Sequence, residues 1–208
     1  MKPEIQGIGP LFKQFDYLQT IDSTNEYLKA FVADGEPRMA VAREQTAGKG
    51  RYAHRWYSPA GEGLYVSYLV FPGWRVDQSS FLEILAGLAV VRTIARQAPS
   101  SMPVRLKRPN DIFISGKKVC GVLTETSTLQ DQILWAIIGI GINLYQKKFP
   151  DDLSHKATSL EAQGLSVEHP LDFCEVLTEE IQRLYRELAE GAWGPLQTEF
   201  EGLLEVTP

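Results

Sequence analysis

The chain has few residues of the kinds that bind metals or form disulfides, with two cysteines and three histidines among 208 residues. Cys120 lies in an apolar segment and Cys174 in a helical pattern, and two scattered cysteines do not make a disulfide framework. The cysteines and histidines also lack the spacing of a metal site, so we expect no fixed metal site in the protein. No Ser-His-Asp or Cys-His arrangement can be argued from position either. These scarcities argue against thiol proteases and metallohydrolases, and favour a reducing compartment.

Long hydrophobic runs are also missing. The N-terminal sequence lacks the apolar run of a signal peptide, and the most apolar stretch, residues 133–142, is too short to span a bilayer. The net charge of −5 argues against nucleic-acid binding as the main function. We therefore expect a cytoplasmic protein that binds neither a membrane nor DNA.

The composition is that of an ordinary globular protein, with 44% hydrophobic and 23% charged residues, which suits one large domain with its own core. Apolar residues spaced three and four apart predict two long helices, at residues 79–98 and 171–189. A capping sequence followed by helical spacing predicts a shorter helix from Asp22 to about residue 34. Alternating or continuous apolar runs predict strands at residues 39–43, 63–71, 104–107, 111–114, 119–126 and 134–143.

These elements predict an α+β fold, in which a mixed, largely antiparallel sheet is flanked by helices. The segment 134–143 is nearly all apolar and is therefore expected at the centre of the sheet. Gly116-Lys117 is expected to form a hairpin turn, and residues 147–155 a loop. Residues 191–208 make a tail that is too short to fold alone.

The first candidate site is residues 45–56, called the glycine-rich loop below, where Gly48 and Gly50 stand beside Lys49 and Arg51. Backbone N–H groups and cationic side chains in such a segment can converge on a phosphate or a carboxylate. The segment lacks the Gly-x-x-x-x-Gly-Lys-Ser/Thr pattern of a Walker loop. Taken alone, the motif is a weak signal, and a flexible, solvated loop is the more common interpretation of such a segment.

Further candidate positions lie in the expected strands. In Lys107-Arg108-Pro109-Asn110-Asp111 a proline interrupts a strand, which aims polar side chains out of the sheet or forms an ordinary turn. Lys118 enters an apolar strand, and Gly121 within that strand indicates either a close approach by a ligand or a bulge. Gly139 and Gly141 interrupt the strand expected at the centre, which favours a flat ligand against it or a helix packed across it.

Taken in order, these segments resemble the catalytic domain of biotin–protein ligases over about residues 15–190. No single motif is decisive, and the specificity of the resemblance comes from the order and spacing of all of them. The segments that carry it are Asp22-Ser23-Thr24-Asn25, Gln45 to Arg51, Trp56, Lys107 with Pro109-Asn110-Asp111, Lys118 with Gly121, Gly139 to Asn143, and Ala157-Thr158-Ser159-Leu160.

The resemblance implies the fold shared by lipoate-attaching enzymes and class II aminoacyl-tRNA synthetases. Members of the family use ATP, biotin and Mg²⁺ to form biotinyl-5′-adenylate and pyrophosphate. A lysine of a carrier, either the biotin carboxyl carrier protein or a carboxylase biotin domain, then attacks the mixed anhydride. The resemblance therefore implies a ligase with ATP and biotin as substrates.

Individual roles are also carried over by resemblance, residue by residue. The residues implied in catalysis are Lys118, Arg51 and Asp111, the last to orient the incoming lysine amine or accept its proton. Those implied in biotin binding are Ser23, Thr24, Gln45, Gly48, Lys49, Arg51, Lys118, Gly121, Gly139 and Gly141. Those implied in binding ATP or the adenylate are Lys49, Arg51, Trp56, Lys107, Asn110, Lys118 and Asn143.

The chain departs from the family pattern at several positions. Many members have tryptophan where this chain has Arg108, and the family's loop is often richer in arginine, whereas this chain has Lys49, Tyr52, Ala53 and His54. The expected organisation is a catalytic domain over residues 1–190 and a short tail over 191–208, without the family's usual C-terminal β domain and without a DNA-binding domain. The family often pairs through a sheet edge, which makes a homodimer the expected assembly.

Two other functions compete with the biotin ligase. One is a lipoate or octanoate ligase or transferase of the same fold, against which the ordered Gln-Thr-Ala-Gly and Pro-Asn-Asp elements favour biotin. The other is a non-catalytic biotin-binding relative, suggested by the altered loop and opposed by the retention of Lys107, Asp111 and Lys118.

Overall fold

A computed structural model describes residues 11–99, 102–108 and 111–205. Within these ranges seven strands form one sheet in the order β1-β2-β3-β7-β6-β5-β4. β1 and β2 run parallel, and the other neighbouring pairs are antiparallel. The strands are β1 (Gln14–Leu18), β2 (Arg38–Ala42), β3 (Gly63–Val70), β4 (Val104–Lys107), β5 (Asp111–Ile114), β6 (Lys117–Leu129) and β7 (Gln132–Asn143).

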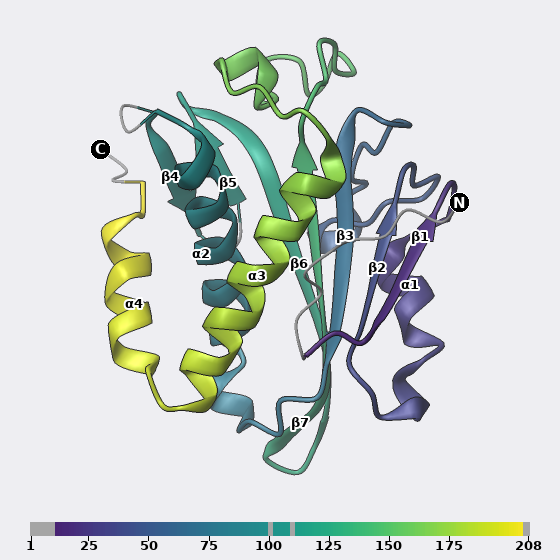
Figure 1. The fold of residues 1–208 in the computed structure, drawn as a ribbon, viewed down its shortest axis with the longest axis vertical. Coiled ribbons are helices and arrows are strands. Elements are labelled where there is room, and N and C mark those ends of the chain that lie inside the picture. Colours follow the sequence, from purple (N-terminus) through teal and green to yellow (C-terminus); the bar gives the residue numbers. More distant parts are fainter. Residues whose placement is uncertain (1–10, 100–101, 109–110, 206–208) are drawn as a thin grey trace.

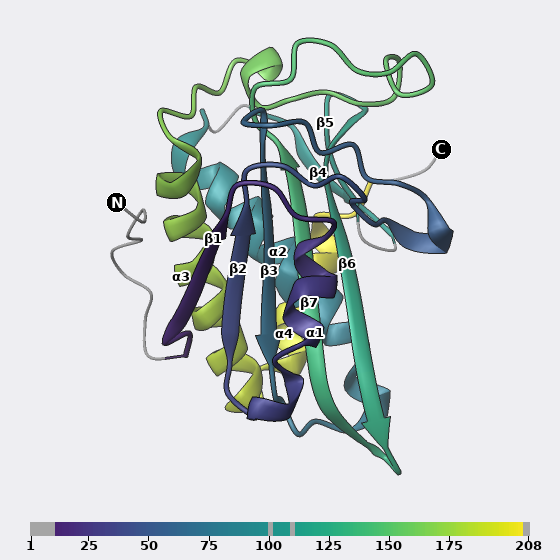
Figure 2. The ribbon, with the colours of Figure 1, turned by 90° about the vertical axis from the view of Figure 1, so that its right-hand side faces the viewer.

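Helices cover both faces of this sheet, as Figures 1 and 2 show. Three helices, α2, α3 and α4, lie on one face, and α1 lies on the other. The described α-helices are α1 (Thr24–Lys29), α2 (Ser80–Gln97), α3 (Pro170–Ala189) and α4 (Trp193–Gly202), and the short 3-10 turns are Val32–Asp34, Arg51–Ala53, Val76–Gln78 and Glu161–Gln163. This arrangement confirms the expected α+β fold with a mixed, largely antiparallel sheet.

The main core lies between the sheet and helices α2 and α3. Leu64, Val66 and Tyr68 alternate along β3 toward this core, while Leu69 faces a smaller cluster beneath α1. This alternation is the two-residue period of a strand whose faces are both covered. By length and composition alone, Val76–Gln97 could cross a membrane. Most of its most apolar 18-residue stretch is buried inside the molecule, as in the core helix of a globular domain.

Most expected elements are confirmed within a few residues, and β7 is the fourth of the seven strands, as its apolar composition predicts. Two expectations need correction. The positive φ angles that make the hairpin turn belong to Ser115 and Gly116, so the turn begins one residue earlier than expected. The first helix ends at Lys29, and a separate 3-10 turn reaches Asp34.

The segment after residue 190 packs on the same core. Leu196 and Phe200 of α4 are buried, and the chain then passes beside the edge strand β4. The Leu106 amide donates to the Leu203 carbonyl at 2.9 Å, and the Glu205 amide donates to the Leu106 carbonyl at 2.7 Å. This end of the sheet is therefore covered by the chain's own backbone.

Candidate functional site

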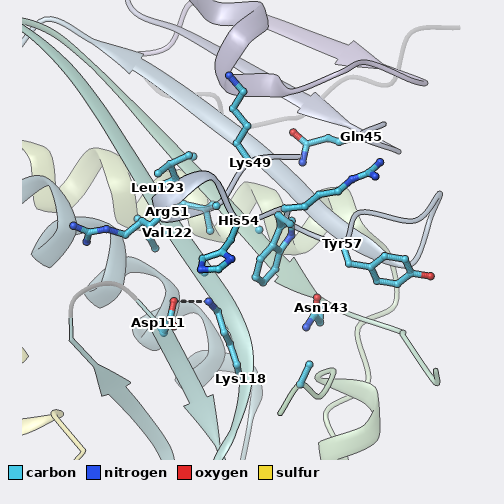
Figure 3. Close-up of a pocket in the computed structure, with 18 of the residues that line it drawn as sticks. Gln45, Lys49, Arg51, His54, Tyr57, Asp111, Lys118, Val122, Leu123 and Asn143 are labelled. Carbon is cyan, nitrogen blue, oxygen red and sulfur yellow. Dashed lines mark ion pairs between the residues drawn. The ribbon is translucent and has the colours of Figure 1, made fainter. Parts of the chain in front are cut away.

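A cavity of about 500 Å³ lies on the face of the sheet that carries α1. Its floor is formed by β6 and β7, and the glycine-rich loop crosses it (Figure 3). A cavity of this size accommodates a small organic ligand. It brings together most of the side chains and glycines that the sequence indicated: Ser23, Thr24, Gln45, Lys49, Arg51, Trp56, Asp111, Lys118, Gly121, Gly139, Gly141 and Asn143.

Two further indicated residues, Gly48 and Lys107, do not line this cavity. Gly48 lines a second, more open depression, which the glycine-rich loop forms together with Leu123 and Glu125. The Lys107 side chain is exposed, and its ammonium lies 5.3 Å from the centre of the Phe113 ring. Asn110 falls outside the described residues.

The space beside the glycines of the floor is already occupied by side chains from other segments. A Cβ on Gly139 would overlap the Asn25 amide of α1, so a helix packed across the strand is the correct interpretation there. A Cβ on Gly141 would overlap the Trp56 indole, and one on Gly121 would lie 3.0 Å from the same ring. Trp56 Nε1 is buried and has no hydrogen-bond partner among the described residues. A ligand against Gly141 therefore has to share this space with the indole.

One end of the cavity is a network of side-chain hydrogen bonds. The Thr24 amide and hydroxyl both donate to Gln45 Oε1, at 2.9 and 3.1 Å. Gln45 Nε2 in turn donates to Ser58 Oγ at 3.0 Å. Ser67 Oγ lies 2.7 Å from Thr24 Oγ1 and 2.6 Å from Asn25 Oδ1. These bonds fix the direction of each polar group at this end.

Two polar residues of this network, Asn25 and Ser67, were not predicted as site residues from the sequence. Ser67 is fully buried in β3, where it is a polar residue in an otherwise apolar strand. A buried hydroxyl needs a hydrogen-bond partner, so this exception in the strand pattern was a signal that could have identified it. The segment 147–155 was expected only as a loop, yet Phe149 and Asp152 in it, together with the following Lys156, form a wall of the cavity.

The opposite part of the cavity carries an ion pair. Lys118 Nζ lies 2.6 Å from Asp111 Oδ1 and 5.3 Å from the centre of the Trp56 ring. The Lys118 backbone pairs with the segment that forms the wall, because its amide donates to the Lys156 carbonyl and its carbonyl accepts from the Thr158 amide. Strand and wall therefore hold this lysine at the cavity, where Figure 3 shows the pair.

The glycine-rich loop is held by its own hydrogen bonds and by two ion pairs. The Trp56 amide donates to the Gly48 carbonyl at 2.9 Å. Lys49 Nζ pairs with Glu26 Oε1 at 2.6 Å, and Arg51 Nη1 pairs with Glu83 Oε1 at 3.0 Å. Figure 3 shows both cationic side chains directed away from Lys118. Lys49 and Arg51 are therefore both paired with carboxylates in this conformation.

Titration of Glu26 follows from the same contacts. Hydrogen bonds from Lys29 and then Lys49 lower the pKa of this carboxyl below its ordinary value of 4.5. The carboxylate is therefore ionised at neutral pH, and it stays available to hold the loop lysine until the medium is strongly acidic.

In the described ranges, no group of three or more histidines, cysteines, aspartates or glutamates is arranged to hold a metal ion. The fold and the cavity define a class of protein: an α+β domain with a partly apolar cavity, a hydrogen-bonding network at one end and a lysine at the other. Such a cavity suits a small molecule that carries both a polar ring and an anionic group.

A family model identifies this class more closely. The model of the biotin/lipoate A/B protein ligase family matches residues 17–143, and the chain belongs to that family. This match covers the glycine-rich loop, the Asp111–Lys118 pair and the glycines of the cavity floor.

Similar proteins agree with the family. A bifunctional ligase/repressor BirA of Bacillus spizizenii is 36% identical over 173 residues, which are 81% of this chain and 51% of that protein. A biotin–[acetyl-CoA-carboxylase] ligase of Mycobacterium tuberculosis is 30% identical over 80% of this chain and 62% of its own length. The structure of biotin protein ligase from Aquifex aeolicus in complex with biotin and ATP superposes with a TM-score of 0.77 at 30% identity, over 93% of this chain and 79% of that one. The chain thus spans about half the length of the Bacillus protein.

Proposed function

We propose that the protein is an ATP-dependent biotin–protein ligase. In the first step a carboxylate oxygen of biotin attacks the α-phosphorus of ATP, and pyrophosphate leaves. In the second step a carrier lysine amine attacks the acyl carbon, an amide bond forms, AMP leaves and the amine loses a proton. The observation that carries the proposal is one cavity that joins the Thr24–Gln45 hydrogen-bonding network to the lysine of the Asp111–Lys118 pair.

The first step brings two anions together, so a cation between them lowers the barrier. Lys118 supports this role because its ammonium lies in the cavity, and Asp111 is its one carboxylate partner among the described residues. Arg51 and Lys49 are the further cations that an adenylate can recruit, once they exchange their glutamate partners for phosphate oxygens. The glycine-rich loop would then exclude water from a reactive anhydride.

For the second step, the group proposed to accept or orient the amine proton is Asp111. Its carboxylate lies at the cavity wall and already has Lys118 as a partner. A carboxylate in that position can receive a hydrogen bond from the incoming neutral amine and accept the proton that the nitrogen loses as the amide forms. When bound with the nucleotide, Mg²⁺ would neutralise charge on the triphosphate, and no fixed protein ligand is proposed for it, since Asp111 already pairs with Lys118.

The hydrogen-bonding end supports biotin over lipoate. The ureido group of biotin offers two N–H donors and a carbonyl acceptor, and the polar side chains around Thr24, Gln45 and Ser67 can match them. The dithiolane ring of lipoate has no such groups, so it would gain no hydrogen bonds from this end of the cavity. A site built around hydrogen bonds discriminates strongly against a ligand that lacks them.

Biotin-dependent exchange of labelled pyrophosphate into ATP tests the first step directly. The wild-type protein is expected to catalyse the exchange, and K118A and R51A are expected to lose most of it. The matched control is K117A, since Lys117 is the adjacent, exposed lysine. Stabilisation of the protein by lipoate or octanoate but not by biotin, in thermal-shift titrations, would overturn the choice of substrate. Equal exchange by wild type and K118A would overturn the role of the lysine.

The proposed partner is a biotin carboxyl carrier protein or a carboxylase biotin domain, and the proposed location is the cytoplasm. Transfer is tested by incubation with labelled biotin, MgATP and a purified carrier domain, reading both adenylate and biotinylated product. Homodimerisation is proposed through β1, since β4 at the other edge is covered by residues 203–205. Sedimentation at several concentrations measures it, and a monomer at all of them would refute it.

A further inference from the structure

Gln146 is a buried polar residue that the proposed mechanism does not use. Its side chain is 1% exposed and lies just beyond the end of β7, behind the wall of the cavity. Its Nε2 is 3.3 Å from Asn143 Oδ1 and 3.5 Å from the Tyr65 hydroxyl oxygen. Its Oε1 is buried without a partner in the described part of the chain. An amide buried with an unpaired oxygen is costly and calls for an explanation.

The directions of these hydrogen bonds follow from the backbone carbonyls of Thr158 and Pro59, because a carbonyl can only accept. The Thr158 carbonyl lies 2.9 Å from the Asn143 amide, so the end of that amide facing it is Nδ2. Asn143 Oδ1 therefore faces Gln146, which has to present Nε2 to it. Because the Tyr65 hydroxyl donates to the Pro59 carbonyl at 3.0 Å, it can only accept from Gln146.

Both N–H groups of Gln146 are committed by this assignment, and its oxygen is the atom left over. Asn143 lines the cavity and is 3% exposed. Its amide keeps one N–H and one lone pair for a ligand, in an orientation that the protein has fixed. The same chain of bonds joins Pro59, which follows the glycine-rich loop, to Thr158, which ends the wall segment.

We propose that Gln146 is a positioning residue for the part of the cavity around Asn143, where the nucleotide is proposed to bind. It acts through Asn143: together with the Thr158 carbonyl, it holds that amide in the orientation that offers an N–H to an acceptor atom of the nucleotide. This inference rests on the proposed ligase function, since it takes the ligand beside Asn143 to be ATP or the adenylate. Gln146 Oε1 is left unpaired at a cost in stability, and that cost is tolerated because Nε2 of the same amide is needed to hold Asn143.

Methionine at position 146 separates this role from mere filling of space. Q146M keeps a long side chain of similar volume and removes both N–H donors. The matched control is Q163M, because Gln163 donates to the Thr158 hydroxyl at 3.0 Å and does not contact the Asn143 amide in any described hydrogen bond. Both variants are first compared with the wild type by thermal unfolding, so that a global loss of structure is recognised.

We expect Q146M to lose affinity for ATP and to keep its affinity for biotin. Calorimetric affinity for ATP should fall about three- to ten-fold in Q146M, the size of one lost neutral hydrogen bond, while the affinity for biotin is unchanged. Q163M should resemble the wild type in both. For Q146E, ATP affinity relative to the wild type should fall as pH rises, since only the protonated carboxyl can donate to Asn143 Oδ1.

A measurement without ligand keeps this inference separate from the proposed function. In NMR spectra of the free protein, the Asn143 side-chain amide signals should shift or broaden in Q146M and not in Q163M. Unchanged Asn143 signals in Q146M would overturn the positioning role, as would equal losses of ATP and biotin affinity. If the wild-type protein binds no ATP, the proposed function fails, and the NMR comparison alone decides the role of Gln146.

Discussion

Replacing Glu83 by glutamine is the sharpest test of how the glycine-rich loop meets an anionic ligand. The Glu83 carboxylate holds Arg51 at 3.0 Å, and the two side chains are 25% and 33% exposed. A partly exposed pair of this kind contributes roughly 0.2–1 kcal/mol. An adenylate phosphate has to take Arg51 away from this carboxylate before it can use the guanidinium. E83Q should therefore raise the affinity for ATP by about 1.4- to 5-fold, because 1.36 kcal/mol corresponds to a factor of ten.

Isothermal titration of ATP into the wild type and E83Q measures this difference. It should be largest at low salt and shrink at about 0.5 M salt, since screening weakens partly exposed charges. The matched control is E179Q on α3, which removes the same charge from a surface pair with Arg96. Unchanged ATP affinity in E83Q would show that the pair does not compete with the ligand. Weaker affinity would show that Glu83 instead orients Arg51 toward it.

Three other predictions follow from burial and charge. G141A adds a Cβ where the Trp56 indole lies, so tryptophan emission should change and urea unfolding should show a loss of about 1–3 kcal/mol. Hydrogen bonds from Lys29 and then Lys49 lower the pKa of Glu26 below 4.5. Their contribution to the stability of the folded protein is therefore complete above pH 4.5 and is lost as pH falls through the lowered pKa. The unfolding free energies of wild type and E26Q should converge in that acidic range. Burial raises the pKa of Cys174 to about 12, so a thiol reagent at pH 8 should modify it only after unfolding.

The sequence predicted the long elements well because their patterns are strong. The two long helices carry apolar residues at helical spacing over five turns, and the central strand is nearly all apolar. β1 was missed because its alternation is short: within Gln14–Leu18 only Phe15 and Tyr17 pack against the main core, and no residue of the strand is fully buried. Its place at the edge comes from parallel pairing with β2, a contact between distant segments that a local pattern cannot report.

The sequence predicted most of the residues that line the candidate site, but it did not predict which of these residues contact one another. Glycines at positions 139 and 141 indicated free space, but a missing side chain does not say what fills that space. The structure places Asn25 and Trp56 there. The partners of the loop cations lie 23 and 32 positions away in the chain, so no local motif identifies them. Lys107 fits the family pattern, yet its side chain lies over Phe113 and away from the cavity lining.

The parts of the cavity differ in how far they are organised before a ligand arrives. Around Thr24 and Gln45, and around Asn143 and Gln146, the donors and acceptors are already directed by bonds within the protein. The middle differs, because the loop cations are held by carboxylates and the Trp56 ring occupies the floor. Hydrogen bonds at the organised ends cost a ligand little ordering, whereas the middle has to rearrange. We therefore expect substrates to dock at the two ends first, and the exchange of ion pairs in the loop to control how fast the adenylate escapes.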